Sequence, residues 1–164
     1  MPEQTDDTDL TLVLERQIAA SPAAIWRCWT DDTLIKQWFA PKPVSVVSAK
    51  IDPVPGGIFN VVMQMPDHDP MEGPSGCVLL VEPHKRFVWT AALGPGFRPN
   101  PPHDSPDDFY NTVDITLTAT ESGTRYVVKA LHATTAHKAA HEAMGFHTGW
   151  GTMTDQLAAM AATL

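Results

Sequence analysis

Hydrophobic residues recur at every second position through much of the chain and predict a protein built largely of β-strands. Leu10, Leu12 and Leu14 give this pattern first, which is typical of a half-buried strand, and it ends near residue 18. Six further strands are expected over residues 44–51, 58–65, 76–81, 86–93, 109–120 and 124–133. Most of them are joined by short turns, which favour antiparallel pairing.

Two short helices and one long helix complete the predicted elements. Ser21-Pro22 is a typical helix start, because Ser caps the first turn and Pro already has a helical φ. It predicts a helix over residues 23–30, and an Asp at 31 or 32 begins a second helix that ends near residue 38. Near the C-terminus, apolar residues at spacings of 4 and 3 form one stripe on a long helix. This stripe comprises Phe146, Trp150, Met153, Leu157, Met160 and Leu164.

These elements predict one α+β domain. A helix with a single apolar stripe must bury it, and the sheet is the surface large enough to do so. A long antiparallel sheet twists and curls. We therefore expect a curved antiparallel sheet of about six to seven strands around the C-terminal helix, with two short helices after the first strand. The acidic residues 1–8 are expected to be a disordered lead-in, and residues 9–164 the single domain.

Composition narrows the classes of partner. Apolar residues make up 43% of the 164 residues and charged residues 18%, which is typical of a globular chain. The net charge of −8 argues against nucleic acid and against an anionic membrane surface as partners. No apolar stretch approaches the roughly 20 residues that span a bilayer, and the N-terminus does not resemble a signal peptide. A cytoplasmic location is the expectation.

The cysteines offer little chemistry. Cys28 lies in a helical pattern and Cys77 opens a strand pattern, so both are expected to be buried thiols that pack as small apolar groups. A disulfide is not expected without an export signal. The sequence places no base beside either thiol that would make it a nucleophile.

A series of short motifs resembles a known superfamily. In chain order they are Arg16 with Ala20-Ser21-Pro22, Trp26 with Trp29-Thr30-Asp31, QWFAP at 37–41, DPVPGG at 52–57, Gly76 with VEPHKRFVWT at 81–90, GTR at 123–125, and Gly149-Trp150. In this order they resemble the SRPBCC (START/Bet v-like) superfamily. Within it, the chain is similar to bacterial proteins related to the C-terminal domain of the activator of the 90-kDa heat-shock protein ATPase. The resemblance covers about residues 10–160 and implies a helix-grip fold.

The resemblance also implies an apolar ligand cavity between the sheet and the long helix. Strand alternation and the helical stripe select the residues that would line it. They are Phe59, Val61, Met63, Leu79, Phe87, Trp89, Val113, Ile115, Leu117, Tyr126, Val128, His132, Trp150, Met153 and Leu157. A slip of one residue in register would move a strand's set to the other face. The alternative is that these side chains fill a solid core.

Four histidines lie between residues 132 and 147. His137 and His141 are four apart and could share a helical face, as two metal ligands would. The segment is Ala-rich and lacks a third ligand at a diagnostic spacing, so we expect a solvated face, with no metal and no cofactor. His132 shares strand parity with Tyr126 and Val128, which predicts an inward side chain, either satisfied in the core or contacting ligand.

Two further features are an arginine with an expected structural role and a Pro-rich loop that could cover the cavity. Arg16 shares parity with apolar strand positions and is expected to be a buried cation paired with Asp114 or Glu15. Residues 94–108 contain five Pro and predict a long loop without regular structure, which could act as a lid.

Three functions are carried forward. The first is binding of a small apolar molecule without catalysis. The second is a co-chaperone-like interaction module, as the resemblance suggests; a chaperone partner is not favoured, and a homodimer stays open. The third is an enzyme of cyclase or hydrolase type, which needs a titratable side chain in the cavity. Its candidates are His132, Tyr126, Asp114 and Arg16.

Overall fold

The computed structural model describes residues 7–102 and 109–164 and has the predicted α+β architecture. In chain order the elements are η1 (Asp7–Leu10), β1 (Thr11–Ile18), α1 (Pro22–Thr30), α2 (Asp32–Ile35), β2 (Ser45–Ile51), β3 (Ile58–Gln64), β4 (Gly76–Glu82), β5 (Arg86–Thr90), β6 (Leu93–Gly94), η2 (Pro95–Phe97), β7 (Arg98–Pro99), β8 (Thr112–Thr120), β9 (Gly123–Leu131), α3 (Thr135–Ala143) and α4 (Phe146–Ala161). Of the predicted lead-in, residues 1–6 lie outside the described part of the chain.

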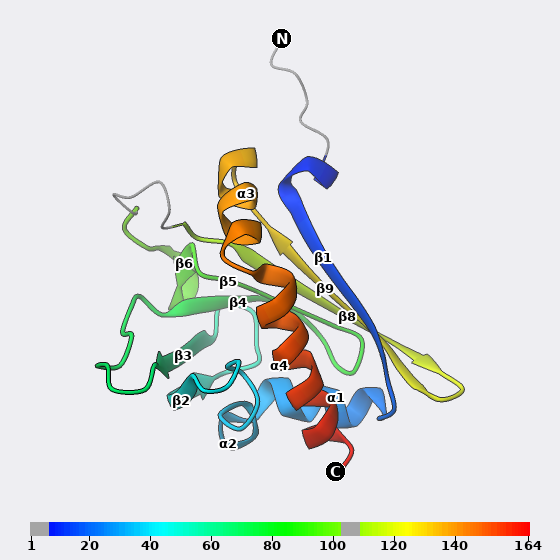
Figure 1. The fold of residues 1–164 in the computed structure, drawn as a ribbon. Helices are drawn as coiled ribbons and strands as arrows, with labels where there is room; N and C mark the ends of the chain where they lie inside the picture. Colours follow the sequence, from blue (N-terminus) through cyan, green and yellow to red (C-terminus); the bar gives the residue numbers. More distant parts are fainter. Residues whose placement is uncertain (1–6, 103–108) are drawn as a thin grey trace.

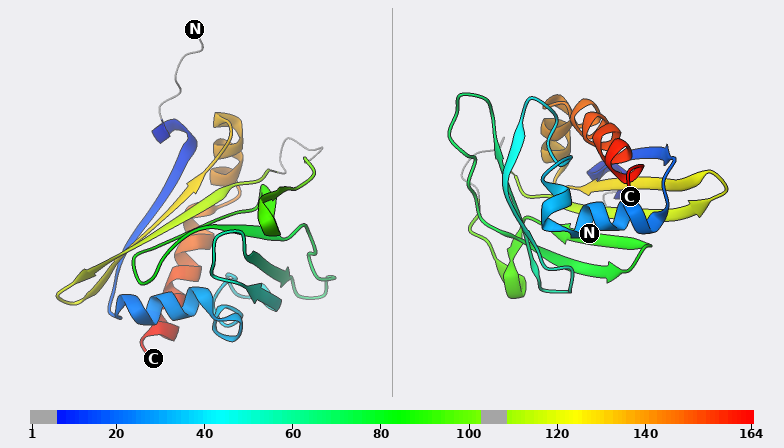
Figure 2. Two further views of the ribbon diagram at one scale, coloured as in Figure 1. Left: turned by 180° about the vertical axis from the view of Figure 1, so that it is seen from behind. Right: turned by 90° about the horizontal axis from the view of Figure 1, so that it is seen from below.

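Seven strands form one curled antiparallel sheet in the order β1-β9-β8-β5-β4-β3-β2. The helix α4 crosses its concave face, which we call the inner face (Figure 1). The short helices α1 and α2 close one end of this face, and α3 lies beside β1 at the other end (Figures 1 and 2). The prediction of a sheet curved around a C-terminal helix, with two short helices after the first strand, is confirmed.

Aromatic side chains fill the inner face where it meets α1 and α2. Trp29 is fully buried, and its ring lies 4.9 Å from Trp38, 5.5 Å from Phe39 and 6.3 Å from both Phe59 and Phe87, measured between centroids. Ring pairs at these separations add attraction beyond the burial of apolar area. We call these five residues the closed end.

The polar atoms of the closed end are satisfied. Trp29 Nε1 donates a hydrogen bond to the Tyr126 hydroxyl at 3.2 Å, and Trp38 Nε1 donates to the Cys28 carbonyl at 2.9 Å. A buried Trp N–H usually finds such an acceptor, because an unsatisfied buried donor costs free energy. The closed end is therefore a rigid core and not a site for a ligand.

The C-terminal region contains two helices, whereas the sequence predicts one. The hydroxyl of Thr134 accepts a hydrogen bond from His137 N at 3.1 Å and so caps α3. Gly145, with φ +94°, then adopts a left-handed conformation that ends α3 and begins α4 in a new direction. Among the described residues, no helix is both long and apolar enough to cross a membrane.

One glutamine fixes α4 to the segment that follows α2. Gln156 Nε2 donates to the carbonyls of Trp38 at 2.8 Å and Ala40 at 2.7 Å, and its Oε1 accepts from Lys42 N at 3.2 Å. These bonds satisfy backbone groups of an irregular segment that has no ladder partner of its own.

The Pro-rich segment is partly regular, which corrects the prediction of an unstructured lid over residues 94–108. Strands β6 and β7 pair as a small hairpin, and Asn100 Nδ2 donates to the carbonyls of Ser75 and Ala91. Gly96 N donates to the Gly56 carbonyl at 2.8 Å. The hairpin lies on the side of the sheet away from α4, so it does not cover the inner face (Figure 2). Residues 103–108 of the predicted loop lie outside the described part.

Candidate functional site

The strand register places most of the residues predicted to line a cavity on the inner face. Phe87 lies opposite Ile115, and Ile115 lies opposite Val128, so one side-chain row crosses three strands. The buried members of the set are Phe59, Phe87, Val113, Ile115, Leu117, Tyr126, Val128, His132, Met153 and Leu157. Val61, Met63, Trp89 and Trp150 are half-buried and pack against them.

Leu79 is the exception, because β4 contains an irregularity that the sequence pattern does not show. Val78 pairs with Trp89, but Leu80 pairs with Val88, so the register shifts by one residue between them. A β-bulge of this kind changes which residues face inward. Val78 and Val81 pack with the core, and Leu79 does not.

The inner face is less completely filled at some positions. Val61, Met63, Trp89 and Trp150 keep part of their surface exposed although they point inward, and we call these four residues the open end. A hollow of about 140 Å³ adjoins Trp150, between the last turn of α3 and the first turns of α4. Its lining consists of His141, Met144, Gly145, Phe146, Gly149, Trp150 and Met153.

Glycine residues keep space at this hollow. A Cβ built on Gly145 or on Gly149 would meet no atom within 4 Å among the described residues. Gly149 lies inside α4, where glycine costs about 1 kcal/mol relative to alanine. Gly149 thus lowers the stability of α4 at a position that borders open space.

Trp89 brings an unused hydrogen-bond donor to the open end. Its indole stacks on Phe59 with ring centroids 4.0 Å apart and planes 10° apart. Its Nε1 atom is buried and has no hydrogen-bond partner among the described residues. A buried donor that lacks an acceptor costs about 1–3 kcal/mol. An acceptor atom on a bound molecule would recover that free energy.

The ion pair predicted for Arg16 is wrong. Asp114 alternates with inward neighbours and so lies on the outer face, where Arg86 holds it through bonds of 3.1 and 2.8 Å. The Glu15 carboxylate accepts from Arg125 Nε instead. Arg16 is exposed, and its guanidinium donates to the Glu15 carbonyl at 3.1 Å. Asp114 therefore supplies no charged group to the inner face, whereas Arg16 lies on the inner side of β1, with Nη2 3.3 Å from a Cβ built on Gly151 of α4.

Tyr126 and Cys28 are held neutral by the closed end. Burial raises the pKa of the Tyr126 hydroxyl far above its usual range. Burial likewise raises the pKa of the Cys28 thiol to about 11. The Tyr126 oxygen already accepts from Trp29, so this side chain serves the core.

His132 is buried and uses both ring nitrogens. Its Nδ1 lies 3.0 Å from the Leu10 carbonyl, and its Nε2 lies 2.8 Å from His141 Nδ1. Phe109 stacks on His137, with centroids 5.4 Å apart, and packs against the His132–His141 pair. The predicted solvated face for His141 is wrong, because β9 and α3 bring it against His132.

No group of three possible metal ligands occurs among residues 7–102 and 109–164. The contact between His132 and His141 depends on the start of α3, which the sequence analysis missed. A Thr capping residue at 134 and a Gly at 145, which bracket the segment, are the signals that could have indicated it.

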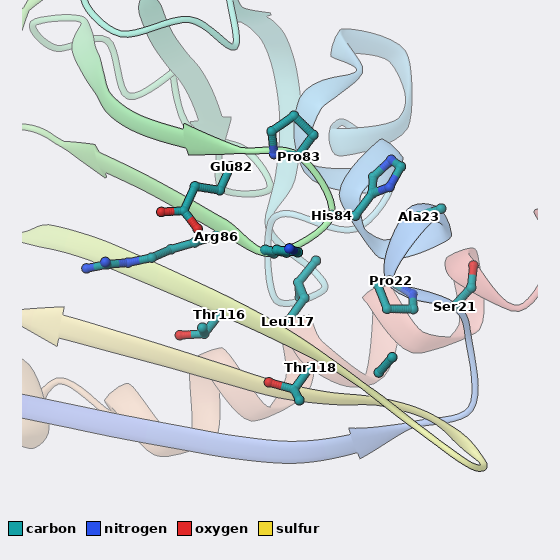
Figure 3. A pocket seen from close by; sticks show the side chains of 12 residues that line it. Ser21, Pro22, Ala23, Glu82, Pro83, His84, Arg86, Thr116, Leu117 and Thr118 are labelled. Atoms are coloured by element: carbon teal, nitrogen blue, oxygen red, sulfur yellow. The ribbon is translucent and has the colours of Figure 1, made fainter.

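A broader surface groove of about 680 Å³ lies elsewhere, between the start of α1, the β4–β5 turn and β8 (Figure 3). Three of its polar residues serve the scaffold. Ser21 Oγ accepts from Ala24 N as the helix cap, Arg86 pairs with Asp114, and the Lys85 carbonyl accepts from Leu117 N. The groove is open to solvent and presents no arrangement of catalytic groups.

Comparison with known proteins agrees with the fold. The family model for the activator of Hsp90 ATPase homolog 1-like proteins matches residues 19–162. A crystal structure from Nitrosomonas europaea shares 40% identity, with 96% of this chain and 97% of that chain covered and a TM-score of 0.89. Structures from Rhodobacter sphaeroides (22% identity, coverage 98% and 97%, TM-score 0.81) and Mycobacterium smegmatis (25%, 94% and 92%, 0.71) have the same fold. None of the curated proteins matches the chain.

Proposed function

Because the chain belongs to the activator of Hsp90 ATPase homolog 1-like family, whose fold wraps a sheet around one helix, we propose that it binds a small apolar molecule at the open end. The binding region is the inner face of β3 and β5 together with the first turns of α4. The ligand would lie against Val61, Met63, Trp89 and Trp150 and extend into the hollow beside Gly149.

The main support for the proposal is the incomplete burial and hydrogen bonding of Trp89. Its ring faces inward and is stacked, yet its N–H is buried without an acceptor among the described residues, and Met63 and Trp150 on the same face are also only half-buried. Binding sites for small molecules combine apolar walls of this kind with a few convergent polar groups. Methionine and tryptophan suit such walls because they adapt to ligands of different shape.

Titration with naphthalene tests the proposal, read out by tryptophan fluorescence and by thermal stabilisation. We expect saturable quenching and a rise in Tm with ligand concentration, because a ligand that binds only the folded state stabilises it. The variant Gly149→Leu should fill the hollow and weaken binding about tenfold or more. Thr148→Leu adds the same side chain at an exposed neighbouring position and should bind as the wild type does.

An unsaturable signal, or equal weakening by both leucine variants, would contradict the proposal. A panel of apolar ring compounds that gives no stabilisation would contradict it as well.

The co-chaperone-like role is the alternative, and it needs an exposed docking surface. Val13 and Leu131 line one surface pocket over β1 and β9 on the outer face and are 45% and 39% exposed. A pull-down with the 90-kDa chaperone, comparing wild type with Val13→Lys, separates the two functions. A homodimer through the β1 edge would be disrupted by the same variant, and sedimentation velocity distinguishes that outcome.

A further inference from the structure

The hydrogen bonds of His132 and His141 fix the position of each proton. A carbonyl only accepts, so His132 Nδ1, 3.0 Å from the Leu10 oxygen, carries the hydrogen. In the neutral ring His132 Nε2 is then an acceptor. The bond of 2.8 Å therefore runs from His141 Nδ1–H to His132 Nε2. His141 Nε2 is left as an unprotonated acceptor.

The surroundings keep both rings neutral. Burial lowers the pKa of His141 to about 4, with a smaller contribution from His132. Burial also lowers the pKa of His132, while the Leu10 carbonyl opposes the shift and His137 and Lys138 reinforce it. At neutral pH the chain Leu10 carbonyl–His132–His141 thus carries no charge, and its tautomers stay fixed.

The His141 ring lies at the hollow beside Trp150. The His141 ring lines this hollow with Phe146, Trp150 and Met153, and it contacts Phe146 edge-on with centroids 5.1 Å apart. Nε2 is the other ring nitrogen, and the bond to His132 does not use it. Among the residues that line the hollow, His141 has the one imidazole ring, and its Nε2 is an acceptor.

We propose that His141 Nε2 accepts a hydrogen bond from a hydroxyl group on the bound molecule, so that the ligand is an apolar alcohol or phenol and not a plain hydrocarbon. This inference rests on the proposed function, since it names the ligand class of the same site. His132 is a positioning residue, because it holds the His141 tautomer and does not touch the ligand.

Binding of 2-naphthol and of naphthalene tests the inference. The two probes differ by one hydroxyl group, so the ratio of their affinities reports the hydrogen bond. We expect the wild type to prefer 2-naphthol about five- to tenfold, which is the usual contribution of one hydrogen bond. His141→Asn retains an N–H near the Nδ1 position for His132 but removes Nε2, and it should bind both probes equally. His147→Asn changes an exposed histidine on α4 and should retain the preference.

The outcomes are distinct. If the wild type binds both probes equally, the hydroxyl inference fails while apolar binding stands, and if it binds neither, both fail. A preference that survives in His141→Asn also overturns the role of His141.

The tautomer can be measured without any ligand. In a long-range ¹H–¹⁵N spectrum of the wild type at neutral pH, His141 should show a protonated Nδ1 and an unprotonated Nε2. In free histidine the Nε2–H form is the more populated one. Finding that form at His141 would overturn the inference whatever the binding data show.

Discussion

The closed end and the open end lie on the same inner face but differ in how completely their side chains are buried and hydrogen-bonded. At the closed end, Trp29 is 1% exposed and its N–H is satisfied by Tyr126. At the open end, Trp89 and Trp150 are half-buried, and the Trp89 N–H has no acceptor among the described residues. Both ends use tryptophan, so composition does not distinguish them. The completeness of burial and of hydrogen bonding does.

The difference indicates that the two halves of α4 have different roles. The C-terminal half of the helix is fixed by Leu157, which is fully buried, and by Gln156, which bonds the segment after α2. The N-terminal half follows the capping residue Gly145 and contains Gly149 and Gly151. Strong packing at one end stabilises the fold, and this allows the other end to keep space and an unsatisfied donor.

The largest expected change in the free energy of unfolding comes from removing a tryptophan side chain, and it should differ between the two ends. Trp29→Ala removes a fully buried ring and should lower the free energy of unfolding by about 3–5 kcal/mol. Trp150→Ala should cost only about 1–2 kcal/mol, because part of its surface is already in water. Chemical denaturation of the two variants measures both values, and equal costs would show that the two ends do not differ in packing.

Much of this contrast could not be predicted from the sequence. Alternation correctly placed Phe87, Val113 and Ile115 on the inner face, because period-2 patterns report the face directly. It misplaced Leu79, because a bulge changes the parity of β4 without changing its composition. It also placed Arg16 as a buried cation, whereas the side chain ends at the surface.

The histidine pair illustrates a second limit. His132 and His141 are nine residues apart, on β9 and at the end of α3, and their contact depends on where that helix starts and points. The Ala-rich segment has no apolar stripe, so periodicity did not indicate α3. Long-range contacts of this kind come from packing and not from local pattern.

Replacement of Gln156 should have the next largest effect on the free energy of unfolding. Gln156→Ala leaves the carbonyls of Trp38 and Ala40 without their donor and should cost about 2 kcal/mol, from bonds worth about 1 kcal/mol each. Asp155→Ala, at an exposed position on the same helix, is the matched control and should change stability by less than about 0.5 kcal/mol. Thermal and urea unfolding of the pair provide the measurement.

Acid should destabilise the protein through His141. Its pKa is about 4 when folded, below the ordinary value of 6.5, so the unfolded chain binds protons more readily. Stability from this group is complete above pH 6.5 and is lost as the pH falls toward 4. The loss should be about 1–2 kcal/mol, reduced from the ideal value because the ring is only partly buried.

Unfolding measured across this pH range in wild type and His141→Asn tests that dependence. The variant should lose the part of the slope that belongs to His141. A slope unchanged in His141→Asn but flattened by His147→Asn would contradict the assignment.

The smallest expected change in stability comes from alanine substitutions at two glycines of α4. Gly149→Ala should stabilise the protein by about 0.5–1 kcal/mol, since its Cβ enters open space and helix propensity improves. Gly151→Ala should gain less, because its Cβ would lie 3.3 Å from Arg16 Nη2. If both variants gain equally, the tight contact at Gly151 has no energetic effect.

Methyl NMR during titration with 2-naphthol examines the open end most directly. We predict saturable shifts of the Met63, Val61 and Met153 methyl signals, with the Ile25 methyl of α1 and the Ile35 methyl of α2 unchanged. Shifts confined to Leu117 and the surface groove of Figure 3, or no saturable shift at any methyl, would contradict binding at the open end.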